Sequence, residues 1–311
     1  MTSRIEWVRG NCRLLAGISA EFGRTRPLQG ITIGTGIHLE PKTAALLLTL
    51  ADGGARVVST GNLSSTQADV VAYLRDHGID VAGGTTTDQA EHDLHLEQVL
   101  AARPDLLLDN GGDLFVRYLA DPYPGLRGGT EETTSGRMRL QPLAGQLNLP
   151  VLVINDSPIK QFAENRHAVG QSVLESYQRI TTGADLDLLG DGVVLCNAGH
   201  FPTEIAVRQL LDSPRVVSQV EAAEGITTLR LDDGRRIHLL TRGHMVNLAG
   251  PRPLGNSIES MDLGFALQAR CLEAVASGTV SAAVTPVPAV IDRAVASAFL
   301  DAYGSPGCRS R

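Results

Sequence analysis

Short β-branched runs alternate with amphipathic stretches over the first half of the chain. The runs predict strands, and the stretches between them predict helices. The predicted strands are Ile31–Ile33, Ala55–Ser59, Ile79–Ala82, Asp105–Leu108 and Val151–Ile154, and the predicted helices are Pro41–Ala51, Thr66–His77, Thr87–Ala102 and Arg137–Leu147. Strands that alternate with helices are typical of a parallel sheet covered on both faces. The pattern therefore predicts an α/β fold with a doubly wound parallel sheet.

The second half of the chain is less regular. A helix is expected at about Glu164–Thr181 and a strand at Val193–Leu195. The next two runs flank Asp232-Asp233-Gly234, a turn sequence that predicts a β-hairpin. These runs are Thr227–Leu231 and Arg236–Leu240, and two helices follow at about Ser260–Ala276 and Pro288–Tyr303.

Composition excludes several classes of partner. The 311 residues carry a net charge of −7 and only 4% aromatic side chains, and the basic residues are scattered, which argues against a nucleic-acid partner. No apolar run approaches the roughly 20 residues of a membrane span, and the amino terminus lacks the apolar stretch of a secretory signal. We therefore expect a cytoplasmic protein without a membrane partner. The cysteines are widely spaced, so we expect reduced, mostly buried thiols and no metal site. They are Cys12, Cys196, Cys271 and Cys308.

Polar side chains gather in the turns that follow the predicted strands. In a parallel sheet, ligands bind at the carboxyl ends of the strands, where these turns lie. The side chains are His38, Asn62, Ser65, Thr66, Gln67, Asp109, Asn110, Asp113, Asn155, Asp156 and Lys160. Asn and Asp often only close turns or cap helices, but a turn has no need of Lys or His. The sequence predicts a functional site at this edge.

Three further sequence patterns are candidates for a binding or catalytic role. The run Glu131–Ser135 is either a helix start favoured by its dipole or a carboxylate that binds vicinal hydroxyls or acts as a base, and composition leaves both open. Gly34-Thr35-Gly36 begins like a dinucleotide fingerprint, but the sixth position is Leu39, so we expect no NAD there. His92 and His95 have the spacing of a metal pair, and a solvated helix face is the favoured interpretation.

Seven segments, in order, resemble the S-adenosylhomocysteine hydrolase family between about Trp7 and Phe299. They are GIHLEPKTAALLLTL, GNLSSTQADVVAYL, LLLDNGGDL, GTEETTSG, VLVINDSPIKQFAEN, VVLCNAGHFPTEI and LDDGRRIHLLTRGHMVNL. The resemblance implies a substrate-binding α/β domain at residues 1–182, a remnant of the cofactor-domain region at 183–250, and helices at 251–311 that return to the first domain.

The resemblance also implies roles for individual residues. It matches His38 to a proton-shuttling histidine near the 5′ carbon of the substrate and Glu132 to the acid that holds the ribose hydroxyls. The implied catalytic set is His38, Glu132, Lys160, Glu164 and His200. The implied substrate-binding set is Glu40, Lys42, Asn62, Ser65, Thr66, Gln67, Asn110, Asp113, Thr133, Asn165, Asn256, Met261 and Phe265. The family's catalytic Asp is Asn110 here, and its Thr and Gln after the first histidine are Glu40 and Lys42.

The family's NAD-binding domain has little room in this chain. Only thirteen residues, Ile180 to Gly192, precede the segment that begins VVLCNAGHF, whereas one βαβ unit takes about 30 residues. The ending SPGCRSR also lacks the Lys- and Tyr-bearing tail that helps to hold NAD in the family. We therefore expect no NAD or other cofactor.

Without a hydride acceptor, an unactivated sugar C–H is too weak an acid for a lysine or a histidine to deprotonate. The expected function is a non-redox lyase or cyclase that acts on a small molecule derived from S-adenosylmethionine or similarly activated, in specialised biosynthesis. The alternative is a non-catalytic protein that binds a nucleoside or S-adenosylhomocysteine, and a third option is that a separate protein supplies the cofactor domain. We expect a homo-oligomer, as in the family, and a dimer in particular.

Overall fold

The computed structural model describes residues 3–162, 186, 189–197, 207–249 and 256–304. The chain divides into two compact units. The first comprises Met1–His167 and Ser257–Arg311, and the second comprises Ala168–Asn256. The predicted division at residues 182 and 250 stays a prediction, as does the helix at Glu164–Thr181, which lies outside the described residues.

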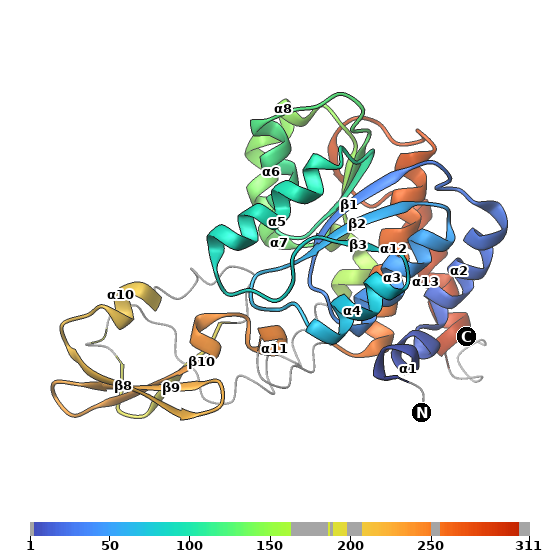
Figure 1. Cartoon of the computed structure of the whole chain (residues 1–311). Coiled ribbons are helices and arrows are strands. Elements are labelled where there is room, and N and C mark those ends of the chain that lie inside the picture. Colours follow the sequence, from blue (N-terminus) through green and yellow to red (C-terminus); the bar gives the residue numbers. More distant parts are fainter. Residues whose placement is uncertain (1–2, 163–185, 187–188, 198–206, 250–255, 305–311) are drawn as a thin grey trace. The chain divides into compact units, whose positions relative to one another are not determined.

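A seven-stranded parallel sheet forms the centre of the first unit (Figure 1). Its order is β11-β6-β5-β4-β1-β2-β3, and every neighbouring pair is parallel. The strands are β1 Thr32–Ile37, β2 Arg56–Gly61, β3 Asp80–Val81, β4 Leu106–Asp109, β5 Gly128–Glu131, β6 Val151–Val153 and β11 Val284–Pro286. Most of these strands are buried on both faces, as in parallel sheets generally.

Helices cover both faces of this sheet, so the predicted doubly wound α/β fold is confirmed. One face carries α1 Arg4–Asn11, α2 Arg13–Thr25, α3 Pro41–Asp52, α4 Ala68–Asp76, α12 Ile258–Ala276 and α13 Ala289–Tyr303. The other carries α5 Gln89–Ala101, α6 Asp113–Ala120, α7 Thr134–Leu140 and α8 Ala144–Leu147. Each face has its own apolar core, and no helix among the described residues is long and apolar enough to cross a membrane.

Strand β5 and helix α6 were not predicted from the sequence. β5 reads Gly-Gly-Thr-Glu, which has neither alternation nor β-branched bulk. The structure explains its glycines, because a Cβ at Gly129 would lie 1.9 Å from the carbonyl oxygen of Leu107 on the neighbouring strand. The single helix predicted at Arg137–Leu147 is wrong, since it is two helices, α7 and α8, separated by a 3₁₀ turn at Gln141–Leu143 that contains Pro142.

The second unit contains a four-stranded sheet of order β7-β10-β9-β8. Its strands are β7 Val193–Leu195, β8 Val216–Ala223, β9 Ile226–Leu231 and β10 Arg236–Leu240, and short helices lie at α10 Val207–Leu211, η5 Thr241–Gly243 and α11 Val246–Ala249. The predicted hairpin is confirmed, because β9 and β10 pair antiparallel across Asp232-Asp233-Gly234, and Gly234 adopts a φ of +87°.

Candidate functional site

The carboxyl ends of the central strands bring together a chain of four buried polar side chains. Glu132 follows β5 and accepts from Lys160 Nζ at 3.4 Å through Oε1 and from Asn110 Nδ2 at 2.9 Å through Oε2. Asn110 follows β4, and its Oδ1 accepts from Asn62 Nδ2 at 3.2 Å. All four side chains are at least nine-tenths buried. A carboxylate that is held by an ammonium and an amide donor is suited to bind hydroxyl groups.

His38 lies at the end of β1, and its ring orientation follows from two contacts of Ser65. The Ser65 Oγ donates to the carbonyl oxygen of Asn62 at 3.2 Å and lies 2.5 Å from His38 Nδ1. Because the serine hydroxyl has only one proton, it accepts from Nδ1–H, which leaves Nε2 as the basic nitrogen of the neutral ring. The structure thus sets His38 up to move a proton at Nε2.

Glu40 and Lys42 form a second buried acid–base pair at the start of α3. Glu40 Oε2 and Lys42 Nζ are 3.2 Å apart, and both side chains are more than nine-tenths buried. Burial raises the pKa of Glu40, and the charge of Lys42 acts in the opposite direction. Among the described residues, Glu40 Oε1 is buried without a hydrogen-bond donor. A carboxylate oxygen in that state can take an N–H or O–H from a ligand.

Helix α13 supports the turn that carries Lys160. The carboxylate of Asp292 accepts a hydrogen bond from the hydroxyl of Ser157 and another, at 3.3 Å, from the backbone N–H of Ile159. The Ser157 Oγ in turn accepts from the backbone N–H of Lys160 at 3.3 Å. A residue near the end of the chain therefore holds the backbone next to the site.

We predict that Asp292→Ala lowers both stability and turnover. The change leaves the buried Ser157 hydroxyl and the partly buried backbone N–H of Ile159 without their acceptor, and a buried unsatisfied group costs about 1–3 kcal/mol. Urea unfolding should report this loss, and turnover at a temperature where the variant is fully folded should fall because the Lys160 backbone is no longer held. Wild-type turnover in the folded variant would contradict the supporting role of Asp292.

Other residues predicted for the site have different surroundings. Asp113 Oδ1 accepts from Arg139 at 2.5 Å, Gln67 Oε1 accepts from Arg4 at 2.6 Å, and Thr133 caps α7. Thr66 Oγ1 donates to the Asn62 carbonyl. Asn256 precedes α12, Met261 lies in its first turn, and Phe265 lies further along it with its side chain buried in the core. Glu164, Asn165 and His200 lie outside the described residues. The roles that the resemblance implies for these residues stay predictions.

The expectation of a solvated face for the two helix α5 histidines is wrong. His92 and His95 are buried, because α5 packs this side against the sheet, and a Cβ at Gly83 would lie 2.2 Å from the His95 ring. The described part of the chain holds no cluster of three His, Cys, Asp or Glu side chains placed to bind a metal ion. The expectation of reduced, mostly buried thiols is confirmed for the cysteines that the structure describes. These are Cys12, Cys196 and Cys271, which are all free and buried.

Ser157 and Asp292 were not predicted to support the site, and Glu131 was named only within the run Glu131–Ser135. One signal was available for the site itself. The chain has only two lysines among 27 basic residues, Lys42 and Lys160. Lysine is a surface residue in most proteins, but both of these are buried beside a glutamate.

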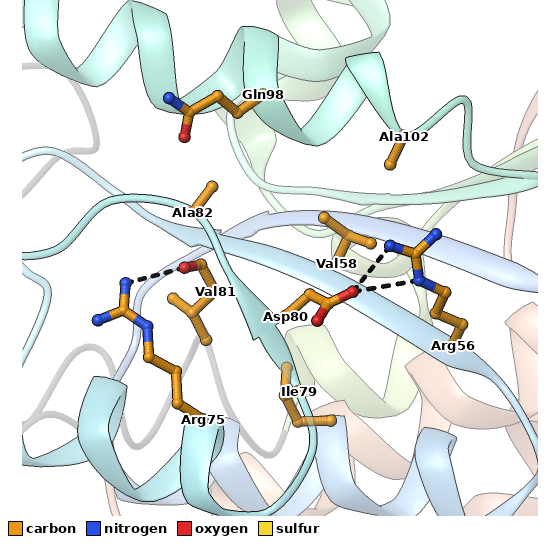
Figure 2. Close-up of a pocket in the computed structure, with 9 residues that line it drawn as sticks. All are labelled: Arg56, Val58, Arg75, Ile79, Asp80, Val81, Ala82, Gln98 and Ala102. Carbon is orange, nitrogen blue, oxygen red and sulfur yellow. Dashed lines mark hydrogen bonds and ion pairs between the residues drawn. The ribbon is translucent and has the colours of Figure 1, made fainter.

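A separate hollow of about 500 Å³ lies beside edge strand β3 (Figure 2). Its two arginines already have partners, since Arg56 pairs with Asp80 at 2.8 Å and Arg75 donates to the carbonyl oxygen of Val81 at 2.9 Å. Arg56 also begins β2, at the end of that strand opposite to the polar cluster. This hollow is therefore not the candidate site.

Comparison with known proteins follows the same segments. Residues 4–122 match the family model of S-adenosyl-L-homocysteine hydrolase, and residues 173–252 match that of its NAD-binding domain. An adenosylhomocysteinase of Thermotoga maritima is 33% identical over 384 aligned positions, which cover 97% of this chain and 94% of that protein. An S-inosyl-L-homocysteine hydrolase of Methanopyrus kandleri is 30% identical over an alignment that covers 96% of this chain and 90% of that protein.

These comparisons correct two expectations. The matched relatives are named as hydrolases, so the expected non-redox lyase or cyclase, and the non-catalytic alternative, are wrong. The match of residues 173–252 to an NAD-binding domain likewise overturns the expectation that NAD is not a cofactor. The thirteen-residue gap was a poor guide to this domain, because the match runs over residues 173–252, most of the second unit. The Thermotoga alignment has more positions than this chain has residues, and the predicted truncation stays a prediction.

The described residues of 173–252 do not by themselves show a dinucleotide cradle. In their sheet only β7 and β10 are parallel, while β8, β9 and β10 form antiparallel hairpins. The sequence of this segment contains no Gly-x-Gly-x-x-Gly turn, which in dinucleotide folds lets the backbone approach the pyrophosphate.

Proposed function

Because the chain belongs to the S-adenosyl-L-homocysteine hydrolase family, we propose that it hydrolyses the thioether of a purine-nucleosidyl-L-homocysteine. Water supplies a hydroxyl to the 5′ carbon and a proton to the sulfur, so that the products are a nucleoside and L-homocysteine. The observation that carries the proposal is the buried cluster of Asn62, Asn110, Glu132 and Lys160 at the carboxyl ends of the strands.

Glu132 and Lys160 act on the ribose in this proposal. The carboxylate of Glu132 accepts hydrogen bonds from ribose hydroxyls and orients the sugar, since ionised acceptors make the stronger hydrogen bonds. Lys160 Nζ, 3.4 Å from Glu132 Oε1, exchanges a proton with a ribose hydroxyl: it passes one proton to the Glu132 carboxylate as it accepts the proton of the hydroxyl, and the reverse transfers restore both groups before the products leave. Asn110 donates to the other carboxylate oxygen, which keeps both oxygens of Glu132 directed within the cluster.

His38 acts at the bond that is broken, between the 5′ carbon and the sulfur. A thiol has a pKa of about 8.5, close enough to that of imidazole for efficient proton exchange near neutral pH. The basic Nε2 accepts a proton from the attacking water, and the protonated ring returns it to the sulfur. The Nδ1–H bond to Ser65 holds the ring in place during this exchange.

The nucleoside is held by residues that the family resemblance implies. Glu40 and Lys42 offer an acceptor beside a donor, and Met261, in the first turn of α12, offers an apolar surface. The relatives include an adenosylhomocysteinase and an S-inosyl-L-homocysteine hydrolase, so the preferred purine is found by comparing the rates with the adenosyl and the inosyl substrate. A homo-oligomeric state and a cytoplasmic location are further proposals.

Thiol release tests the proposed function. Purified protein with NAD present is incubated with S-adenosyl- or S-inosyl-L-homocysteine, and homocysteine is followed with a chromogenic disulfide reagent. We expect saturable thiol release, matched by an equal amount of nucleoside. A sample without substrate gives the background from protein thiols. Cys12, Cys196 and Cys271 should add little to it, because burial raises the pKa of Cys12 to about 12 and also raises the pKa of Cys196 and of Cys271, and the thiolate is the reactive form.

The same assay tests the cofactor. The match to the family's NAD-binding domain leads us to propose NAD, which would supply a hydride acceptor that the side chains of the site lack. Protein stripped of nucleotides should therefore lose turnover and recover it when NAD is added. Equal rates with and without NAD would overturn the cofactor while leaving the hydrolase intact. No thiol from either substrate under both conditions would overturn the function.

A further inference from the structure

Two fully buried carboxylates lie directly behind the polar cluster, and the proposed mechanism does not use them. Asp109 ends β4 and Glu131 ends β5, and the two are opposite each other in the register of these strands. Each immediately precedes a residue of the site, Asn110 and Glu132 respectively. Buried charges persist in proteins only where hydrogen bonds compensate them.

Asp109 holds the turn that leads into α6. One carboxylate oxygen accepts from the backbone N–H of Asn110 at 2.9 Å, and the other accepts from Leu114 and Phe115 at 2.9 and 3.0 Å. The carbonyl oxygen of Asp109 accepts from the backbone N–H of Glu132 at 3.0 Å, which ties the two strand ends together.

Glu131 links two turns. Its Oε1 accepts from the backbone N–H of Gly111 at 3.1 Å and from the N–H and Oγ1 of Thr133, both at 2.7 Å, and its Oε2 accepts from the N–H of Gly112 at 2.9 Å. Gly111 and Gly112 have φ values of +98° and +76°, which only glycine adopts readily. Successive N–H groups in such a turn form an anion nest that in other proteins binds phosphate. Here the anion is the protein's own Glu131.

Every partner of these two carboxylates is a donor. Burial raises the pKa of both Asp109 and Glu131, and so does a neighbouring negative charge, that of Asp113 for Asp109 and that of Asp109 for Glu131, while the backbone N–H donors act in the opposite direction. An amide side chain would turn an NH₂ group toward at least one of the same donors. The packing around Glu131 also leaves no room for a side chain at position 136, because a Cβ at Gly136 would lie 2.1 Å from the Glu131 carboxylate.

On the basis of the proposed function, we propose that Glu131 is a positioning residue. By occupying the nest at Gly111 and Gly112 while also holding Thr133, it sets the distance between the Asn110 turn and the Glu132 turn. The 2.9 Å hydrogen bond from Asn110 Nδ2 to Glu132 Oε2 depends on that distance. Glu131 touches no substrate and acts through Glu132.

The first test is Glu131→Gln, which keeps the shape and changes one acceptor oxygen into a donor. Turnover should fall about 10²-fold, the cost of a misplacement of about 1 Å in an active site. The second readout is the side-chain amide signal of Asn110 in a ¹⁵N NMR spectrum. That signal should shift, because its acceptor has moved, and this readout is independent of turnover.

Glu131→Ala offers a rescue that a merely structural residue would not show. Alanine retains the Cβ, and acetate supplies the two missing carbons with their carboxylate. We expect acetate to restore part of the lost turnover and to return the Asn110 signal toward its wild-type position, whereas propionate, which has one carbon more, should be less effective. Gly136→Ala, which removes no functional group, should reproduce the loss by displacing the Glu131 carboxylate, and acetate should not rescue it.

Asp262→Asn is the matched control. Asp262 is a buried acid that also accepts from two backbone N–H groups with separate oxygens, those of Leu14 and Leu15, but it caps α2. This variant should lose stability with turnover and the Asn110 signal unchanged in the folded protein. An unchanged Asn110 signal in folded Glu131→Gln would overturn the positioning role, whether or not the protein is a hydrolase. Absence of thiol release by the wild type would overturn only the hydrolase.

Discussion

Lys160→Met is expected to lower kcat by about 10²–10⁴-fold, the usual range for the loss of a general acid or base. Methionine fills nearly the same volume but carries no proton, so Glu132 keeps only its hydrogen bond from Asn110 in place of two donors. The same change breaks a buried acid–base pair, which costs about 3–5 kcal/mol of stability. Single-turnover thiol release and urea unfolding measure the two effects separately.

Lys42→Met is the matched control for that experiment. It removes the same charge from the chain's other buried lysine, which pairs with Glu40 at 3.2 Å. Because Lys42 is proposed to bind the nucleoside, its loss should raise KM more than it lowers kcat. Should the two variants show the same division between kcat and KM, Lys160 would have no special part in proton transfer.

Glu132→Gln is expected to lower kcat/KM by about 10²-fold or more, because one carboxylate oxygen becomes an NH₂ group that faces a donor, and hydrogen bonds to charged groups contribute about 1.5–3 kcal/mol. The affected donor is either the Lys160 ammonium or the Asn110 amide. Ribose hydroxyls would also lose an ionised acceptor. Steady-state kinetics with the better of the two thioether substrates gives the size of the effect.

The control is Glu91→Gln, the same chemical change at an exposed glutamate on α5. Glu91 Oε1 is 3.8 Å from His95 Nε2, and its side chain is 56% exposed, so this variant should keep wild-type kinetics. Binding of adenosine to Glu132→Gln, measured by calorimetry, provides a further check. Adenosine affinity equal to that of the wild type would show that Glu132 does not hold the ribose.

The two lysines illustrate how electrostatics and packing combine at this site. Lys160 approaches Glu132 from the turn after β6, while Lys42 approaches Glu40 from the first turn of α3. Both pairs lie at the carboxyl edge of the same sheet. A buried pair of this kind adds little net stability, which is consistent with a role in function rather than in folding.

Local patterns determined much of this protein. Alternating runs predicted the parallel α/β fold, five of the seven central strands within a few residues, and the hairpin around Gly234. Polar residues in the turns after the predicted strands pointed to the carboxyl edge of the sheet, and seven segments that resemble the family in the same order pointed to the family. These features depend on side-chain period and turn chemistry, both of which are visible within about ten residues.

Only the tertiary structure decided which side chains meet. Glu132 and Lys160 are 28 residues apart in the chain, and Ser157 and Asp292 are 135 apart. β5 could not be predicted from its sequence, because its glycine at position 129 is required by the close approach of the neighbouring strand. His92 and His95 are buried because α5 packs the face that carries them against the sheet. The length of one gap was also a poor guide to NAD, since a domain is recognised over its whole extent. Contacts between distant segments depend on the summed packing of the fold, which no local pattern in the sequence contains.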